Sequence, residues 1–314
     1  MTVRPHRPRA ALLAPLVMLA LLALQPGCSG QAGPAPDAAG PFPPVPGGGV
    51  AGELKPAGED EFLRGDYKAA RPLLVNAGRG GSLRAVFFLR IISERGLDGQ
   101  APNPEEAGRL VALLAAMRGR LEELAGRGPA ADRPIYQASL ALVFLRGQTD
   151  GGQDLARALE LARQAASGGL VPAMNLAAAV LLTPGAEAGL LRDLWGGGRG
   201  EAFALSLRAA KAGDALAMAN VGYLFRTGTG TAQDLFQGAS WARKAAALPQ
   251  TTARAMNDLG AIYETGGAVT PDKAEAARWY GLAAARGYPG AAANQARARS
   301  GKAGPPAVLD GLEY

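Results

Sequence analysis

One histidine and one cysteine are the only residues of those types in the 314-residue chain. Both His6 and Cys28 lie near the N-terminus. The rest of the chain therefore has no histidine base, thiol nucleophile, disulfide or soft-metal cluster. Acidic residues cluster at 59–61, 105–106 and 122–123, but adjacent residues of a helix do not face each other. We predict no catalytic residue, no metal site and no cofactor; a carboxylate pair assembled from distant segments stays open as the alternative.

Two glycine-rich stretches, 195–200 and 228–231, could in principle cradle a phosphate. Neither contains the sequence G-x-x-x-x-G-K-[ST], and neither follows a strand pattern. We interpret both as turns between helices.

The positive charge of the chain is mild and dispersed. The formal net charge is +6, and removing Arg4, Arg7 and Arg9 of the N-terminal leader leaves +3. Nucleic-acid-binding domains carry a clustered basic patch, so the sequence predicts no nucleic-acid partner.

The elements that position side chains repeat between residues 213 and 287. Two copies match at a constant offset of 38 residues, a period typical of stacked helical units. The matched pairs are Ala215/Ala253, Ala217/Ala255, Gly222/Gly260, Phe225/Tyr263, Gly228/Gly266, Asp234/Asp272, Trp241/Trp279 and Ala245/Ala283.

Each copy predicts two helices joined by a glycine-rich turn. Apolar residues recur at helical spacing over 215–225 and 253–263. Gly228 and Gly266 suit a left-handed residue that ends a helix. Asp234 and Asp272 are typical helix-start residues for the second helices.

Glycine inside a helix costs about 1 kcal/mol relative to alanine. Gly222 and Gly260 occupy the same helical position in both copies, so we expect close packing there by a neighbouring helix or aromatic ring. Trp241 and Trp279 are expected to be core residues rather than ligand platforms.

These motifs resemble the Sel1-like repeat family, a relative of the tetratricopeptide repeats. The second copy supplies the family pattern nearly intact, with Ala253, Ala255, Leu259, Gly260, Tyr263, Gly266, Asp272, Ala276, Trp279, Tyr280, Ala283 and Ala284. The first copy departs at Val221, Phe225 and Ala242. The resemblance implies an all-α, right-handed α-solenoid of about five helix-turn-helix units over residues 58–300, with a concave face lined by the first helices.

In tetratricopeptide-like arrays the concave face binds peptides or protein surfaces. The resemblance therefore implies a non-catalytic adaptor with a protein or peptide partner. By position on the first helices, the expected binding residues are Asn220, Arg226, Asn257, Asp258 and Glu264. Trp195, in a long insert at 183–200, is either an exposed anchor for a partner or part of a satellite core.

Upstream units follow the same pattern less closely. Helices are expected at 82–95, at 135–146 and 154–167, and at 171–182 and 201–212. Asn103, Pro104 and Glu106 predict the start of one long helix reaching about Gly126. Pro72 predicts a kink or a helix start near it.

The N-terminal segment 1–27 resembles an export signal, with a basic start and a short apolar run. Cys28 after a small residue resembles the lipidation site of bacterial lipoproteins, and Ser29 favours the outer membrane by analogy. Ordinary signal cleavage and a retained membrane anchor are the alternatives. Residues 28–57 predict a disordered Pro/Gly-rich linker, and residues 301–314 a loosely docked or disordered tail.

The expected location is therefore the periplasm, with the membrane contacted only through the lipid. Two functional alternatives remain: an envelope enzyme acting on cell-wall sugar or peptide, and a structural tether of a secretion or envelope complex.

Overall fold

The computed structural model describes residues 54–149, 151–183, 198–248, 251–266 and 269–301. The chain divides into two units, Met1–Gly40 and Pro41–Tyr314, and every described residue belongs to the second. The predicted signal segment 1–27, Cys28, Trp195 and the tail after Gly301 lie outside the described residues.

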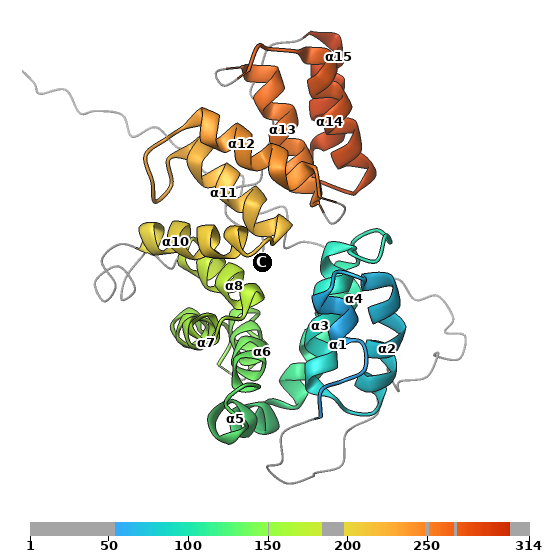
Figure 1. Cartoon of the computed structure of the whole chain (residues 1–314), viewed down its shortest axis with the longest axis vertical. Helices are drawn as coiled ribbons and strands as arrows, with labels where there is room; N and C mark the ends of the chain where they lie inside the picture. Colours follow the sequence, from blue (N-terminus) through green and yellow to red (C-terminus); the bar gives the residue numbers. More distant parts are fainter. Residues whose placement is uncertain (1–53, 150, 184–197, 249–250, 267–268, 302–314) are drawn as a thin grey trace, which may run out of the picture. The chain divides into compact units, whose positions relative to one another are not determined.

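All regular structure in the described residues is helical (Figure 1). The helices are α1 Glu59–Leu63, α2 Tyr67–Arg79, α3 Leu83–Arg95, α4 Pro104–Ala116, α5 Arg118–Arg127, α6 Arg133–Leu145, α7 Leu155–Ser167, α8 Val171–Leu181, α10 Gly198–Lys211, α11 Ala215–Thr227, α12 Leu235–Ala246, α13 Ala253–Thr265, α14 Lys273–Ala285 and α15 Ala291–Ser300. None of them combines the length and the apolar character that crossing a membrane requires.

The helices pack in consecutive pairs. α3 packs on α4, α6 on α7, α8 on α10, α11 on α12, and α13 on α14. First helices also contact the first helix of the next pair, as α6 contacts α8 and α11 contacts α13. The described residues therefore form an all-α repeat solenoid of five full pairs, as the sequence predicts, with α1 and α2 before them, α5 between the first two pairs and α15 after them.

The turn inside a pair is closed by one recurring hydrogen bond. The backbone N–H of the aspartate before the second helix donates to the carbonyl of an aromatic residue near the end of the first. The three bonds are Asp154 to Phe144 at 3.1 Å, Asp234 to Phe225 at 2.9 Å and Asp272 to Tyr263 at 2.8 Å. The side chain of each aspartate then accepts from the first turn of the second helix. One residue type thus both joins the helices and caps the second one.

The two repeat-equivalent glycines are sites of close approach, as predicted. A Cβ atom on Gly222 would lie 3.1 Å from the carbonyl oxygen of Gly238 and 3.2 Å from the backbone nitrogen of Ala242. A Cβ atom on Gly260 would lie 2.7 Å from two ring carbons of Tyr280. Tyr280 is the repeat equivalent of Ala242. Because glycine has no side chain, a helix backbone can approach Gly222 closely and an aromatic ring can approach Gly260 closely.

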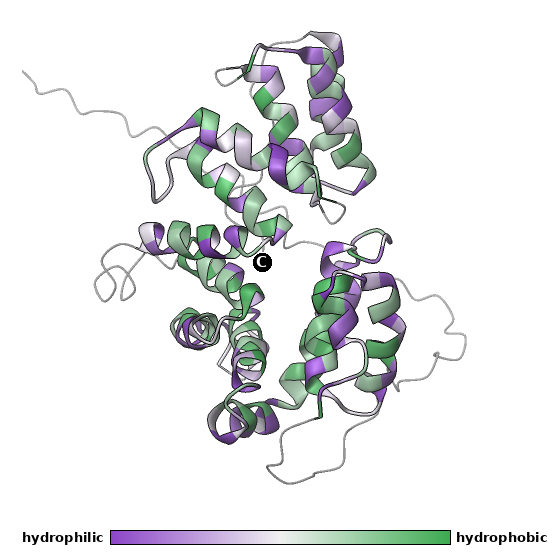
Figure 2. Cartoon of the chain, viewed as in Figure 1, coloured by the Kyte–Doolittle hydropathy of each residue, from purple (hydrophilic) through white to green (hydrophobic). Residues whose placement is uncertain are grey.

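The apolar core runs through successive pairs rather than enclosing one centre. A single cluster extends from Ala70 of α2 to Val221 of α11, and smaller clusters join α11 to α15. α3 and α8 are largely hydrophobic in Figure 2, and nearly every residue along them is buried. Because each pair is covered by the next, the buried apolar residues extend along the whole array.

Trp241 and Trp279 are half-buried and pack against these clusters. A cation lies over each ring: Lys244 at 4.3 Å from the Trp241 centroid and Arg278 at 4.4 Å from that of Trp279. The two indoles thus have similar surroundings, with one side in the core and a cation over the ring.

The prediction of one long helix from Pro104 to about Gly126 is wrong. The chain forms α4 and α5, with a break at Met117 (φ −101°, ψ 19°). α4 packs mainly on α3, whereas α5 packs on α6, and one straight helix would not cover both partners. Pro72 lies within α2, which begins five residues earlier after the side-chain cap Asp66.

Candidate interaction surface on the first helices

Buried polar side chains gather on the first helices. The residues of this set in α3, α6, α8, α11, α13 and α15 are Arg84, Arg90, Ser93, Ser139, Asn175, Asn220, Arg254, Asn257, Asp258 and Asn294. Among the described second helices, only Ser206 of α10 belongs to it. Alanine and leucine suffice to bury a helix face, so this polar set does more than fill the core.

One polar cluster joins α11 to α13. Arg254 and Asp258 are one helical turn apart on α13, which puts both on one face, and Arg226 comes from the last turn of α11. The closest nitrogen–oxygen distances from Asp258 are 3.6 Å to Arg254 and 3.7 Å to Arg226. Both guanidiniums also lie over the ring of Tyr223, at 4.3 Å for Arg254 and 5.4 Å for Arg226.

Burial of Asp258 is only partly compensated by its neighbours. Neither carboxylate oxygen accepts a hydrogen bond by geometric criteria within the described part of the chain. Burial raises the pKa of this carboxyl above its usual range, and the two guanidiniums only partly oppose that effect.

A second cluster joins α13 to α15. Arg297 donates from Nε and Nη2 to the two oxygens of Glu264, at 3.0 and 2.6 Å, and the Tyr280 hydroxyl donates to the same carboxylate at 2.7 Å. Burial opposes ionisation of Glu264, but these hydrogen bonds hold its pKa below the usual value. Burial, followed by the hydrogen bond to Glu264, raises the pKa of Tyr280.

Side-chain amides extend these links along the array. Asn294 of α15 donates to Asn257 of α13 at 3.0 Å, and Asn175 of α8 donates to Asp214 at 3.0 Å. Asp214 caps α11 through the Ala217 backbone N–H and also contacts Arg95 of α3. Polar contacts therefore couple the first helices of different units.

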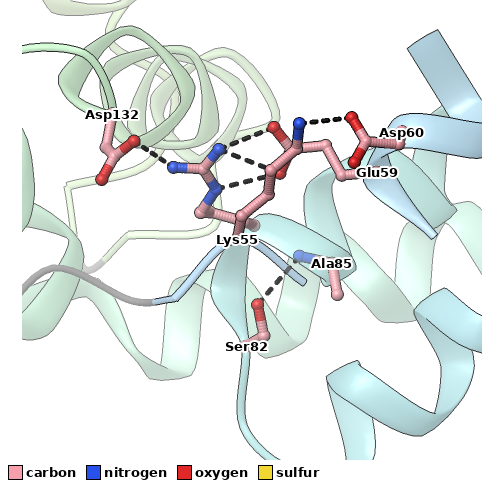
Figure 3. Close-up of polar contacts among 7 residues, drawn as sticks. Lys55, Glu59, Asp60, Ser82, Ala85 and Asp132 are labelled. Atoms are coloured by element: carbon pink, nitrogen blue, oxygen red, sulfur yellow. Dashed lines mark hydrogen bonds and ion pairs between the residues drawn. The ribbon is translucent and has the colours of Figure 1, made fainter. Parts of the chain in front are cut away.

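Arg84 of α3 shows what an arginine at this helix position can bind. Arg84 and Arg254 are each the second residue of a first helix. Arg84 donates to both oxygens of Glu59 and also pairs with Asp132 (Figure 3). Burial lowers the pKa of Arg84, but the hydrogen bonds that it donates to its two carboxylate partners and their negative charge together outweigh burial and raise it overall. This arginine joins α1, α3 and the start of α6.

The predicted binding residues divide by burial. Asn220 and Asn257 are 0% exposed and Asp258 is 2% exposed, so these three side chains are buried in this structure. Their amides and carboxylate instead face neighbouring helices. Arg226 and Glu264 are partly accessible.

Sequence reasoning did not name four residues of these clusters as binding residues: Tyr223, Arg254, Tyr280 and Arg297. Arg297 stands where the repeat pattern has leucine, and Arg254 stands where the other copy has Leu216; these departures were the available signal.

The polar groups of these clusters are of kinds that recognise peptides. No group of three histidine, cysteine, aspartate or glutamate side chains in the described ranges could hold a metal ion. The buried carboxylates of both clusters are paired with guanidinium groups. Guanidinium, amide and tyrosine groups are the side chains that bind peptide carboxylates, carbonyls and N–H groups.

Comparisons with known proteins agree with this architecture. The family model of the Sel1 repeat matches residues 134–170, 215–249 and 253–288. The chain is similar to the crystal structure of a protective antigen of uropathogenic Escherichia coli strains displaying an SLR fold. Identity is 24%, the TM-score is 0.50, and the match covers 78% of this chain and 48% of that one. This chain therefore spans about half the length of that antigen.

Two further solved structures are similar to lesser degrees. A Sel1 repeat protein from Oxalobacter formigenes is 23% identical with a TM-score of 0.44, covering 74% of this chain and 63% of that one. A putative Sel1 repeat protein from Klebsiella pneumoniae is 19% identical with a TM-score of 0.40, covering 78% and 100%. No curated protein matches the sequence. The chain therefore contains three Sel1-like repeats within an all-α repeat array.

Proposed function

We propose that this protein is a non-catalytic adaptor that binds protein or peptide partners along the side of the array formed by its first helices. Sel1 repeat proteins generally mediate protein–protein interaction. The observation that carries the proposal is the concentration of buried polar side chains on the first helices, coupled from unit to unit, with the partly accessible Arg226 and Glu264 beside them. A surface needed only for stacking would be as apolar as that of the second helices.

Arg226 is the side chain best placed to meet a partner. Its side chain is 24% exposed, it stacks on Tyr223, and its only carboxylate partner in the described residues lies 3.7 Å away. An incoming acidic or carbonyl group therefore competes with a long ion pair rather than with a short one.

The test is affinity capture from detergent-solubilised membranes with the full chain and two matched variants. Arg226→Ala removes the first-helix guanidinium, whereas Arg243→Ala removes an exposed one from the second helix α12. We expect partners to be lost from the Arg226 variant alone. Equal capture by both variants would refute the proposed face, and one stoichiometric partner would favour a structural tether over an adaptor.

We further propose that the protein is exported and anchored by lipid at Cys28, on the periplasmic side of the outer membrane. The basic start, short apolar run and single cysteine of the sequence support this. Palmitate labelling that survives Cys28→Ser would rule out that anchor. Turnover of peptidoglycan by the purified protein would overturn the non-catalytic assignment.

A further inference from the structure

Four arginines in the described residues hold a carboxylate in the same way. In each case Nε and Nη2, along one edge of the guanidinium, donate to the two oxygens of one glutamate. The pairs are Arg84–Glu59, Arg163–Glu201, Arg278–Glu275 and Arg297–Glu264. Such parallel hydrogen bonds are the strongest arrangement that guanidinium and carboxylate form.

Arg95 is the last residue of α3, and the same Nε–Nη2 edge of its guanidinium is buried but faces no glutamate or aspartate carboxylate in the described residues. Its Nη1 contacts Asp214 at 3.3 Å, and its side chain is only 10% exposed. Within the described ranges, Nε and Nη2 have no hydrogen-bond partner. Buried charged donors without an acceptor destabilise a fold, so this edge is complementary to a ligand that supplies two oxygens.

A cavity of about 210 Å³ adjoins this arginine. Its lining includes Arg95, residues 96–97 and 99–102 of the loop that follows, Thr251, Ala253 and Arg286. Thr251 is buried, and its hydroxyl also has no hydrogen-bond partner among the described residues. Arg286 donates to the Thr251 carbonyl and adds a second positive charge. No acidic side chain lines this cavity; Asp214 lines a smaller neighbouring one.

The start of α13 adds to the positive potential. The cavity reaches Ala253, the first residue of that helix, where backbone N–H groups and the helix dipole favour an anion. The volume corresponds to about seven water molecules at roughly 30 Å³ each. This is room for a carboxylate and little more than one residue.

We propose that this cavity is a carboxylate-binding site. The Nε–Nη2 edge of Arg95 takes both oxygens, the Thr251 hydroxyl donates a further hydrogen bond, and Arg286 supplies the second charge. The ligand is a peptide carboxylate, either a free C-terminus or an aspartate or glutamate side chain. The choice of a peptide as its source rests on the proposed function, whereas the site itself rests on the geometry.

Four short peptides distinguish a C-terminal carboxylate from a side-chain carboxylate as the ligand. Acetyl-triglycine with a free carboxyl end is compared with its C-terminal amide, and amidated acetyl-Gly-Glu-Gly with amidated acetyl-Gly-Gln-Gly. Binding to the full chain is measured by calorimetry at neutral pH. We expect at least one acid to bind about 10- to 100-fold more tightly than its neutral twin, the range for hydrogen bonds to charged groups. Which acid does so identifies the source.

Arg95→Lys is the informative variant, because lysine keeps the charge beside Asp214 but lacks the two-donor edge. It should abolish the preference for acid over amide, while Arg243→Lys on α12 leaves the preference unchanged. Probes that all bind alike, or a preference that survives Arg95→Lys, would overturn the site. The two tests can fail independently. If the peptides discriminate acid from amide but partner capture does not depend on Arg226, the proposed binding face on the first helices is refuted and the carboxylate site is supported. If capture depends on Arg226 but the peptides do not discriminate, the carboxylate site is refuted and the binding face is supported.

Discussion

Replacing Gly260 should destabilise the protein because a buried ring already occupies the space of its side chain. An added Cβ atom would lie 2.7 Å from two carbons of Tyr280, whereas ordinary contacts begin at 3.4 Å. The ring must therefore retreat by about 0.7 Å. It is 0% exposed, and its hydroxyl is held by Glu264 at 2.7 Å, so the helices must move with it.

Overpacking of this kind costs about 1–3 kcal/mol, and the better helix propensity of alanine returns about 1 kcal/mol. We expect Gly260→Ala to lower the free energy of unfolding by about 1 kcal/mol and Gly260→Leu by about 3 kcal/mol. For a domain of this size the Tm falls by about 2–4 °C for each kcal/mol. Urea and thermal unfolding followed by circular dichroism measure both quantities.

Gly108 provides the matched control. It also lies in a helix interior, that of α4, but a Cβ atom there meets no heavy atom within 4 Å. Gly108→Ala should therefore stabilise the protein by about 1 kcal/mol. In a Tyr280→Ala background, Gly260→Ala should lose its cost, because the three atoms nearest to the added Cβ all belong to the Tyr280 ring. An unchanged Tm for Gly260→Leu, or the same sign for both alanine substitutions, would refute this reasoning.

Three further outcomes follow from polar contacts. Glu59→Gln leaves the buried guanidinium of Arg84 with less compensation, so unfolding in urea should show a loss of about 3 kcal/mol. Folding lowers the pKa of Glu264, so the stabilisation that its carboxylate provides is complete above the unfolded value of 4.5 and is lost as the pH falls through the folded value. The Tm difference between wild type and Glu264→Gln should therefore shrink on acidification, and a difference that stays constant would contradict this stabilising role. Asp272→Ala removes two hydrogen bonds to the first turn of α14 and should cost about 1 kcal/mol in thermal unfolding, with exposed Lys273→Ala as the neutral control.

Local signals in the sequence identified much of this fold. Asp234 and Asp272 begin helices because their side chains cap the first turn, and that chemistry needs only three residues of context. Gly260 was identified because its cost recurs in both copies. The break at Met117 left no such mark, since the apolar spacing from Leu114 to Leu121 continues through it.

The polar clusters were harder to predict because they depend on distant partners. A helical pattern shows that Asn257 and Asp258 lie on an inner face, but not that neighbouring helices cover them. Arg95 and Asp214 meet across 119 positions of the chain, and nothing near either residue signals the contact. The array geometry was therefore needed to find the cavity beside Arg95.

The amide and carboxylate links make the units non-interchangeable. Asp214 begins one unit and accepts from both Asn175 and Arg95, whereas Thr252 stands at the same place in the next unit. Deleting one 38-residue repeat would therefore put the threonine hydroxyl where Asn175 and Arg95 now donate to the carboxylate of Asp214. Helix faces made of alanine would pack equally well if the repeats were rearranged. The few polar residues therefore fix the order of the repeats, and they restrict how the array can lengthen or shorten by duplication or loss of a repeat.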